Sequence, residues 1–179
     1  MFWKRRTKNP PALRDWQSTE RFESSWSARI ERMARYLDST DELVLDIGCG
    51  PMWLRQYLPA GLRYQGLDYT NRGNDCIVCD LNRDRLPTTS ASAFFISGCL
   101  EYLDNPERLI TDVSERARKC ILSYCCLDDF PDIKLRTMKG WRNHVTRDEL
   151  LQMFDRHNMQ AIAFDMTESQ NSIFVFVPK

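Results

Sequence analysis

Short apolar runs alternate with amphipathic segments along this chain, and the two patterns predict different elements. The apolar runs are short, continuous and bounded by polar or turn-forming residues, which is typical of buried strands. Segments whose apolar residues recur every three or four positions predict helices with one buried face. The predicted strands are 43–47, 63–68, 75–80, 93–98, 120–125, 161–166 and 172–178, and the predicted helices are 22–37, 52–58, 107–119 and 147–157.

Residues that begin helices or turns support these boundaries. Pro106 suits the first turn of a helix, where its missing N–H costs nothing. Thr146 with Glu149 three residues later forms a capping-box sequence in front of the helix 147–157. The polar segment 167–171 between the last two strands predicts a β-hairpin.

The order of these elements predicts a doubly wound α/β fold. Strands that alternate with helices form a parallel sheet through right-handed crossovers, with helices on both faces. The closing hairpin adds an antiparallel strand, so we expect a seven-stranded, mostly parallel sheet. A ligand crevice in such a sheet lies at the carboxyl ends of the strands. We expect residues 22–179 to form a single domain and residues 1–21 to form a basic N-terminal tail.

The overall charge favours neither nucleic acid nor a membrane surface as a partner. The 179 residues carry 25 Lys and Arg against 25 Asp and Glu, so no global field attracts a polyanion. No run approaches the roughly 20 apolar residues of a membrane helix. No apolar segment typical of a secretory signal follows the basic start. We therefore expect a cytoplasmic protein without a membrane span.

The seven cysteines predict free thiols and no metal site. Their odd number and the missing export signal argue against a disulfide framework. Cys76 and Cys79 have the spacing of zinc ligands, but in a strand these two positions point to opposite faces. No second pair of ligands accompanies them in the sequence.

The sequence LVLDIGCGPMWLRQYLP, residues 43–59, predicts a strand, a glycine-rich turn and a helix at the ligand-binding edge. A dinucleotide-binding turn needs a small residue where Trp53 stands, and Asp46 would repel a pyrophosphate. A phosphate-binding loop needs Gly-Lys-Ser/Thr, which does not follow. A cofactor with a positive charge and no phosphate suits Asp46, and Gly48 and Gly50 leave room for its close approach.

Two further acids follow the next two predicted strands. Asp68 ends the strand 63–68, where a carboxylate can accept hydrogen bonds from both hydroxyls of a ribose. Asp80 ends the strand 75–80, where it can accept from an exocyclic amine while the Leu81 N–H meets a ring nitrogen. Three consecutive strands thus each deliver an acid to one crevice. This set of groups suits S-adenosylmethionine, which carries a sulfonium, an ammonium, a carboxylate, a ribose and an adenine.

The motifs VLDIGCGP, YQGLDY, CDLN and FFISGCLEYLDNP resemble, in order and spacing, those of the class I S-adenosylmethionine-dependent methyltransferases. The resemblance covers roughly residues 22–177 and implies a Rossmann-like fold with this cofactor. The first motif of the family carries an acid and three glycines, and Met52 replaces the third glycine here. The resemblance implies cofactor contacts at Asp46, Gly48, Gly50, Asp68, Asp80, Leu81 and Ser97, with Gly98 beside Ser97 at the methyl-transfer centre.

The residues expected to handle the methyl acceptor are less clearly marked. Methyl transfer from a sulfonium requires mainly alignment, and a hydroxyl acceptor also needs a general base. His144 and Asp128, which follow the strand 120–125, are the candidates for that base. Tyr102, which stands where many family members have His, and Trp141 are candidates for acceptor binding. We also expect arginines of the first helix in the acceptor pocket, namely Arg29, Arg32 and Arg35.

Missing motifs narrow the acceptor class. The sequence SGCL replaces the Asn/Asp-Pro-Pro-aromatic run of the family's DNA, RNA and protein amino methylases, and no Pro-Cys nucleophile is present. We therefore expect transfer to an O or N atom of a small molecule, a sugar or a lipid headgroup. Two alternatives stay open: a non-catalytic binding or scaffold module with this fold, and an RNA methyltransferase that uses the basic tail.

Overall fold

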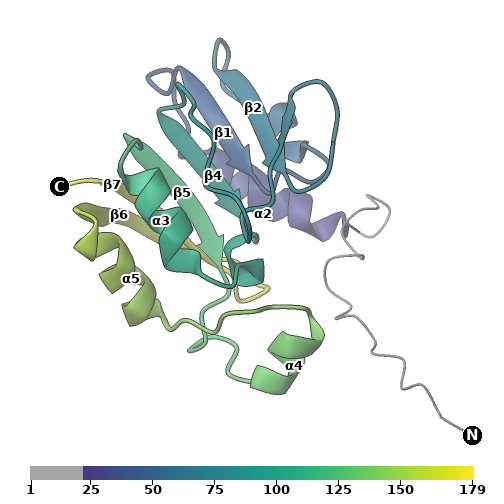
Figure 1. The fold of residues 1–179 in the computed structure, drawn as a ribbon, viewed down its shortest axis with the longest axis vertical. Coiled ribbons are helices and arrows are strands. Elements are labelled where there is room, and N and C mark those ends of the chain that lie inside the picture. Colours follow the sequence, from purple (N-terminus) through teal and green to yellow (C-terminus); the bar gives the residue numbers. More distant parts are fainter. Residues whose placement is uncertain (1–21) are drawn as a thin grey trace, which may run out of the picture.

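The computed structural model describes residues 22–179, so the expected basic tail lies outside the described residues. Its elements, in chain order, are α2 (Ser25–Ala34), β1 (Leu43–Ile47), η2 (Trp53–Tyr57), β2 (Arg63–Asp68), β3 (Cys76–Val78), β4 (Ala93–Ser97), η3 (Leu100–Tyr102), α3 (Pro106–Ser114), β5 (Lys119–Tyr124), α4 (Ile133–Met138), α5 (Arg147–Arg156), β6 (Met159–Met166) and β7 (Ser172–Pro178), where η marks a 3-10 helix. Figure 1 shows their arrangement.

The sheet has seven strands in the order β3-β2-β1-β4-β5-β7-β6. Strands β1 to β5 pair in parallel, and β7 pairs antiparallel with both β5 and β6. The predicted α/β fold with a closing antiparallel hairpin strand is therefore confirmed. The carboxyl ends of the parallel strands point toward η3 and α4, and the connections after these strands meet there (Figure 1).

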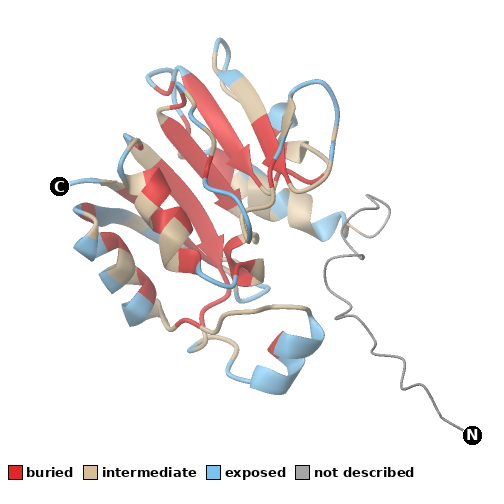
Figure 2. Ribbon diagram, in the orientation of Figure 1, coloured by how far each residue is buried: buried red, intermediate tan, exposed pale blue. Residues whose placement is uncertain are grey.

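Helices cover both faces of the sheet, as the sequence predicts. The face under α2 and η2 buries Val44 and Phe95, whereas Leu45 and Phe94 point to the face under α3 and α5. Adjacent residues of one strand thus enter opposite cores, which explains why β1 is apolar except for Asp46 and β4 is apolar except for Ser97. Within residues 22–179, the central strands are the most deeply buried part (Figure 2).

Several predicted boundaries differ from the structure. The expected helix 107–119 ends at Ser114, because Lys119 pairs with Ala93 at the start of β5. Its Nζ also bridges Asp38 and Asp41, at 2.8 and 2.7 Å. The expected helices 22–37 and 52–58 shorten to α2 and to the 3-10 helix η2, and the expected strand 75–80 shortens to β3.

Helix α4 lies between the predicted strand 120–125 and the predicted helix 147–157, in a segment for which the sequence pattern predicts neither a helix nor a strand. The Asp132 side chain caps it by accepting from the Leu135 N–H at 2.9 Å. The buried guanidinium of Arg136 donates to the carbonyls of Cys125, at 2.8 Å, and Phe130, at 3.2 Å. It also donates from Nε to His144 Nδ1 at 3.0 Å. Arg136 therefore joins α4 to the connections on either side of it.

The predicted capping box and thiol states can be compared directly with the structure. Thr146 Oγ1 accepts from the Glu149 N–H at 3.2 Å, and Glu149 accepts from the Thr146 N–H at 2.8 Å, which confirms the box. All seven cysteines are free thiols. The Cys76 sulfur lies 3.8 Å from that of Cys49, whereas Cys79 Sγ contacts the Arg85 carbonyl at 3.7 Å.

No helix within residues 22–179 combines the length and the apolar character that crossing a bilayer requires.

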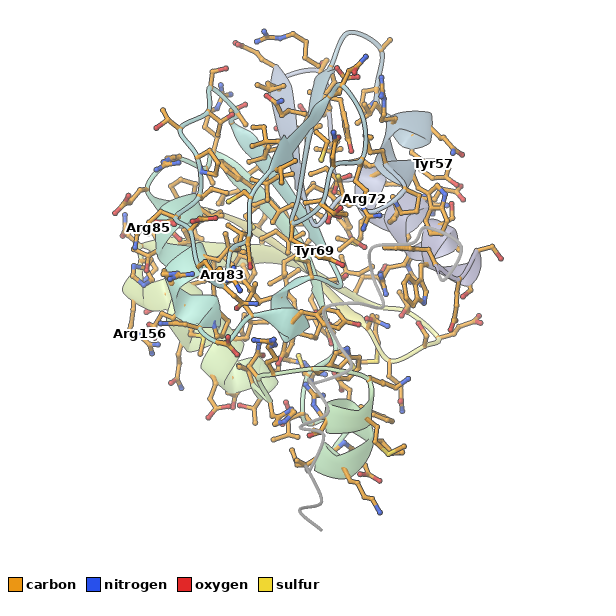
Figure 3. All side chains as sticks on the ribbon, turned by 45° about the vertical axis from the view of Figure 1, so that its right-hand side comes forward. Tyr57, Tyr69, Arg72, Arg83, Arg85 and Arg156 are labelled. Carbon is orange, nitrogen blue, oxygen red and sulfur yellow. The ribbon has the colours of Figure 1, made fainter. Side chains whose placement is uncertain are left out.

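Exposed arginines on the side of α3 and α5 are matched by acids. Arg83, Arg85 and Arg156 are labelled on this side in Figure 3 and form ion pairs with Asp80, Asp112 and Glu107, respectively. Each of these three positive charges thus lies beside a negative one, in keeping with the equal numbers of basic and acidic residues in the chain.

Asp46 is a carboxylic acid inside an otherwise apolar strand. It is buried at the fourth position of β1 and accepts a hydrogen bond from the Tyr64 hydroxyl at 2.9 Å. Burial raises the pKa of Asp46 to about 7, against the opposing effect of the Tyr64 hydrogen bond. The folded protein therefore holds a proton on Asp46 more tightly than the unfolded chain does.

Asp46→Asn should change the pH dependence of stability. An aspartate has a pKa near 3.9 when unfolded, so the wild type should lose stability as pH rises from about 4 to about 7, by roughly 4 kcal/mol in total. The amide does not titrate and still accepts from Tyr64, so the stability of the variant relative to wild type should rise over the same range. Urea unfolding at four pH values measures this difference. A difference that stays constant with pH would contradict it, and Asp75→Asn in a half-exposed ion pair provides the control.

Arg136→Lys should destabilise the protein by about 2–4 kcal/mol, because an ammonium cannot reach all the acceptors of the guanidinium and leaves buried carbonyls unpaired. Arg32→Lys is the matched control. Arg32 forms a partly exposed pair with Asp165, for which a loss below about 1 kcal/mol is expected. Chemical denaturation measures both, and equal losses would show that Arg136 has no special role.

Candidate functional site

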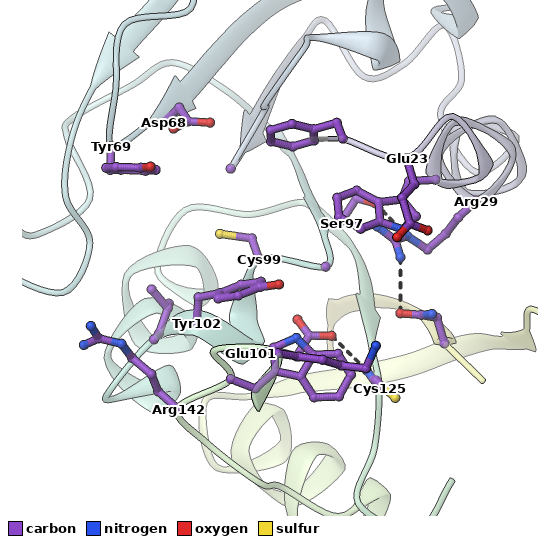
Figure 4. A pocket seen from close by; sticks show the side chains of 18 of the residues that line it. Glu23, Arg29, Asp68, Tyr69, Ser97, Cys99, Glu101, Tyr102, Cys125 and Arg142 are labelled. Atoms are coloured by element: carbon purple, nitrogen blue, oxygen red, sulfur yellow. Dashed lines mark hydrogen bonds between the residues drawn. The ribbon is translucent and has the colours of Figure 1, made fainter. Parts of the chain in front are cut away.

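A cavity of about 930 Å³ lies at the carboxyl ends of the parallel strands. Its lining comes from the start of α2, the connections after β1 to β5, the α4 segment and the turn between β6 and β7. The volume is near the upper end of the range for ligand sites, about 300–1,000 Å³. Figure 4 shows Asp68 and Tyr69 at one end of this cavity, with Tyr102, Glu101 and Arg142 at the other.

The glycine-rich turn after β1 forms one wall and needs its glycines. Gly48 has φ of +71° and Gly50 has φ of +48°. A Cβ at Gly48 would lie 2.6 Å from Cys99 Sγ, and one at Gly50 would lie 2.5 Å from the Phe22 ring. Of the two, Gly48 lines the cavity. Both positions therefore exclude side chains, for conformational and steric reasons.

Met52 keeps the turn in the shape that a third glycine would favour. Its φ of +56° and ψ of +36° place it in the left-handed region, immediately before η2. This conformation costs a residue with a Cβ roughly 1–2 kcal/mol. Met52 thus adopts the left-handed conformation that a glycine would adopt more easily, so the turn forms although the third glycine of the family motif is missing.

Asp68 lies in the cavity wall, and its carboxylate already has protein partners. Oδ2 accepts from the Gly50 N–H at 3.0 Å, and Oδ1 accepts from the Thr70 N–H at 3.2 Å. The Arg72 Nε lies 3.2 Å from Oδ2, and both side chains are almost fully buried. The Arg72 Nη2 also lies 3.5 Å from Oδ1, so protein donors face all of the roughly four acceptor positions of the carboxylate. A ligand hydroxyl would have to share or replace the contacts of Arg72.

Asp46 stands behind this wall. It is not among the cavity-lining residues within the described chain, and its carboxyl group is directed to Tyr64.

Asp80 and Leu81 both line the cavity. Asp80 accepts from the Asn82 N–H at 3.0 Å and pairs with Arg83.

Ser97 and Gly98 line the cavity, and Arg29 from α2 lies against both of them. Arg29 Nε donates to Ser97 Oγ at 3.1 Å, and Nη1 donates to Asn171 Oδ1 at 3.3 Å. Its Nη2 would lie 2.8 Å from a Cβ at Gly98. Burial lowers the pKa of Arg29, which the nearby Glu101 partly opposes.

Of the three arginines expected in the pocket, Arg29 alone lines it. Arg32 is directed to Asp165 on β6, and Arg35 forms an exposed pair with Glu31. Arg29 therefore lines the cavity, whereas Arg32 and Arg35, which follow it by three and six positions, form ion pairs outside it.

The second half of the cavity, away from Asp68 and Asp80, is lined by Tyr102 and Trp141, the two candidates for acceptor binding. Trp141 packs edge-to-face on Phe130, with ring centroids 6.0 Å apart, and the cations of Arg136 and Lys139 lie 4.8 and 5.9 Å from the centroid of its ring. Burial raises the pKa of Tyr102. Leu135 and Met138 of α4 add apolar surface to this half.

His144 and Asp128 are not among the described residues that line the cavity. His144 Nδ1 accepts from Arg136, and burial together with this cation lowers the pKa of the imidazole. Asp128 accepts from the Arg147 N–H at 2.6 Å and so stabilises the start of α5. The structure therefore gives both candidate bases partners outside the cavity.

Glu101 is a cavity residue that the sequence reasoning missed. It is 1% exposed, and its Oε1 accepts from the Cys125 N–H at 3.0 Å. Its Oε2 is buried without a hydrogen-bond partner among the described residues. Burial raises the pKa of Glu101. An acid within the otherwise apolar run GCLEYL was the available signal.

No cluster of His, Cys, Asp or Glu within residues 22–179 is arranged to hold a metal ion.

Comparison with known proteins shows similarity at the level of structure alone. No protein-family model matches the sequence, and no curated protein matches it. Among solved structures, magnesium protoporphyrin IX methyltransferase from Synechocystis PCC 6803, with bound S-adenosylhomocysteine, matches with a TM-score of 0.67 and 16% identity. This match covers 86% of this chain and 83% of that protein.

Two other matches are an O-methyltransferase and an N-methyltransferase. The enzyme NcsB1 from neocarzinostatin biosynthesis, in complex with S-adenosylmethionine and a naphthoic acid, matches with a TM-score of 0.64 and 16% identity, over 87% of this chain and 57% of that one. The 1,6-didemethyltoxoflavin-N1-methyltransferase of Burkholderia thailandensis matches with 0.62 and 13%, over 91% and 79%.

The chain spans about half the length of several proteins that it resembles, for example 56% of TnmH and 55% of the mitomycin 7-O-methyltransferase. The strand order and the glycine-rich turn after β1 agree with the sequence resemblance described above. Taken with these structural matches, they show that the chain has the Rossmann-like fold of the class I S-adenosylmethionine-dependent methyltransferases.

Proposed function

We propose that this protein is a methyltransferase that uses S-adenosylmethionine to methylate an O or N atom of a small, planar acceptor. The observation that carries the proposal is a single cavity with two chemically different halves. One half contains the glycine turn with Asp68 and Asp80, and the other contains Tyr102 and Trp141. The solved structures that share this fold include O- and N-methyltransferases with bound cofactor or product.

The first half fits the cofactor. Gly48 leaves the turn without a Cβ beside the cavity. Asp68 would accept a ribose hydroxyl, and Asp80 with the Leu81 N–H would bind the adenine. Arg29 has an Nη2 without a hydrogen-bond partner among the described residues, beside Gly98. We assign to it the carboxylate of the cofactor, because a partly buried guanidinium is a strong hydrogen-bond partner for a carboxylate.

The cofactor would supply a methyl group on a sulfonium, whose departure leaves a neutral thioether. The contribution of the chain is then to align the acceptor and to exclude water. Alignment of two reactants can lower a barrier by roughly 7–11 kcal/mol. Tyr102, Trp141 and the apolar side chains of α4 enclose the second half of the cavity and would hold the acceptor in place.

The aromatic walls favour a planar acceptor over a sugar or a lipid headgroup. Trp26, Phe130 and Trp141 contribute flat apolar surfaces to the lining, and aromatic rings stack on such surfaces. Two of the matched structures contain planar acceptors, a naphthoic acid and a didemethylated toxoflavin.

The other two readings of the sequence make different predictions about binding. The Asp68–Arg72 pair occupies part of the proposed ribose site, which is the observation that favours a non-catalytic module. Such a module would bind an acceptor or a partner without turnover. An RNA methyltransferase would bind RNA with an affinity that falls steeply with salt.

Asp68→Asn should weaken S-adenosylmethionine binding at least about tenfold, or about 1.4 kcal/mol, because the ribose loses a charged acceptor. For the wild type, ligand at 100 times Kd should add about 2.7 kcal/mol of stability and raise Tm by about 5–10 °C. Titration calorimetry and thermal unfolding measure these effects.

Asp75→Asn, outside the cavity, should bind like the wild type, and NAD should give no shift. If S-adenosylmethionine binds neither protein, the cofactor assignment fails. If it binds and no acceptor is turned over, the non-catalytic module is supported.

Arg29→Met should weaken the binding of cofactor analogues that carry the carboxylate and leave the binding of analogues without it nearly unchanged. We expect an affinity loss of at least about tenfold, or about 1.4 kcal/mol, for S-adenosylhomocysteine, which carries the carboxylate. We expect a change of less than about twofold, or about 0.4 kcal/mol, for 5′-methylthioadenosine, which lacks the carboxylate. Arg32→Met is the control outside the cavity. Equal losses for both ligands would mean that Arg29 shapes the pocket without binding the carboxylate.

A further inference from the structure

Glu101 has one carboxylate oxygen that the fold uses and one that it does not. The residue belongs to η3, directly after the carboxyl end of β4, and lines the cavity. Oε1 accepts from the Cys125 N–H at 3.0 Å and so ties η3 to the end of β5. Oε2 is buried and accepts no hydrogen bond from the described residues. The link between η3 and β5 therefore uses only Oε1.

The unpartnered oxygen lies in the half of the cavity assigned to the acceptor. Figure 4 shows the Glu101 carboxylate beside Tyr102 at this end, with the dashed line from one oxygen to Cys125. A buried carboxylate oxygen without a hydrogen bond is destabilising. A ligand that brings an N–H or O–H into this half of the cavity would remove that penalty.

The charged and titratable groups around Glu101 come from several elements. Arg29 of α2 and Arg136 of α4 favour its ionised form through their positive charge, whereas burial disfavours that form. Tyr102 and Cys99 on its own segment, Tyr124 of β5 and Cys125 after β5 are titratable groups that also interact with it electrostatically. The carboxylate is therefore almost fully buried and under the influence of two guanidinium charges.

We propose that Glu101 Oε2 accepts a hydrogen bond from the hydroxyl or amine that becomes methylated, and that it takes the proton of that group. The acceptor is thereby specified as a planar aromatic molecule that carries an O–H or N–H. This inference rests on the proposed methyltransferase function and adds to it a catalytic residue and a substrate class.

The proposed step is balanced. The lone pair of the acceptor O or N forms the new bond to the methyl carbon as the bond between that carbon and sulfur breaks. The electron pair of the broken bond stays on sulfur, which becomes a neutral thioether. The proton of the acceptor moves to Glu101 Oε2, and Glu101 releases it to solvent when the product leaves. No oxidant, reductant or metal is required.

Glu101→Gln is the variant that isolates the unpartnered oxygen. The amide oxygen can keep the bond to the Cys125 N–H, while an NH₂ donor replaces Oε2. The variant should therefore fold, and it should repel an O–H or N–H donor at this position. Glu107→Gln, on the surface in a pair with Arg156, is the matched control.

The test uses two probes, 2-naphthol and 2-methoxynaphthalene, which differ in whether the oxygen carries a hydrogen. Binding to each protein, saturated with S-adenosylhomocysteine, is followed by quenching of tryptophan fluorescence. Wild type and Glu107→Gln should prefer 2-naphthol at least about tenfold, and Glu101→Gln should lose or reverse that preference. The wild-type preference should also disappear at low pH, as Glu101 becomes protonated and can no longer accept.

Three results would overturn the proposal. If Glu101→Gln keeps the full preference with S-adenosylhomocysteine bound, the role of Glu101 is structural only. If neither probe binds the wild type, the aromatic acceptor class is wrong. If the preference is the same at all pH values, proton acceptance by Glu101 is excluded. Failure of S-adenosylhomocysteine itself to bind would instead contradict the proposed function, and calorimetry on the wild type distinguishes that case first.

Discussion

The parallel pairing of β1 with β2 and β4 is the interaction on which the rest of the structure depends. Its register sets Ile47 beside Leu67 and Ile96, so the three strands end at the same level. The residues that follow them then enter one cavity although they are far apart in the chain. Apolar side chains on both faces hold this register, because a shift by one residue would move each of them into the opposite core.

The second half of the cavity depends on a buried cation. Arg136 joins the carbonyls after β5 to α4 and to the loop that carries Trp141. A guanidinium presents five donors in a fixed plane, so it can hold several turns of backbone that have little apolar surface of their own. The wall proposed to bind the acceptor is therefore fixed by hydrogen bonds, whereas the strands that bear the cofactor half are fixed by apolar packing.

Electrostatics connects the two halves. Asp68 and Glu101 are buried and Arg29 is partly buried in the cavity wall. Glu101 Oε2 and Arg29 Nη2 have no hydrogen-bond partner among the described residues, whereas Asp68 is paired with Arg72. Charged groups that are shielded from bulk water interact strongly with a ligand of complementary charge. The proposed cofactor and acceptor would supply complementary groups to all three.

The sequence by itself determined the order of strands and helices, the closing hairpin and the positions of Gly48, Asp68 and Asp80. These features follow from local patterns, since strand periodicity, turn chemistry and the residue after a strand need no knowledge of distant neighbours. The tertiary structure alone decided that α4 forms, that Arg29 and not Arg32 enters the cavity, and that His144 and Asp128 bind elsewhere. It also revealed Glu101. Which side chain reaches a cavity depends on packing between segments remote in sequence. The local pattern GCLEYL marks an unusual acid but does not show where its side chain points.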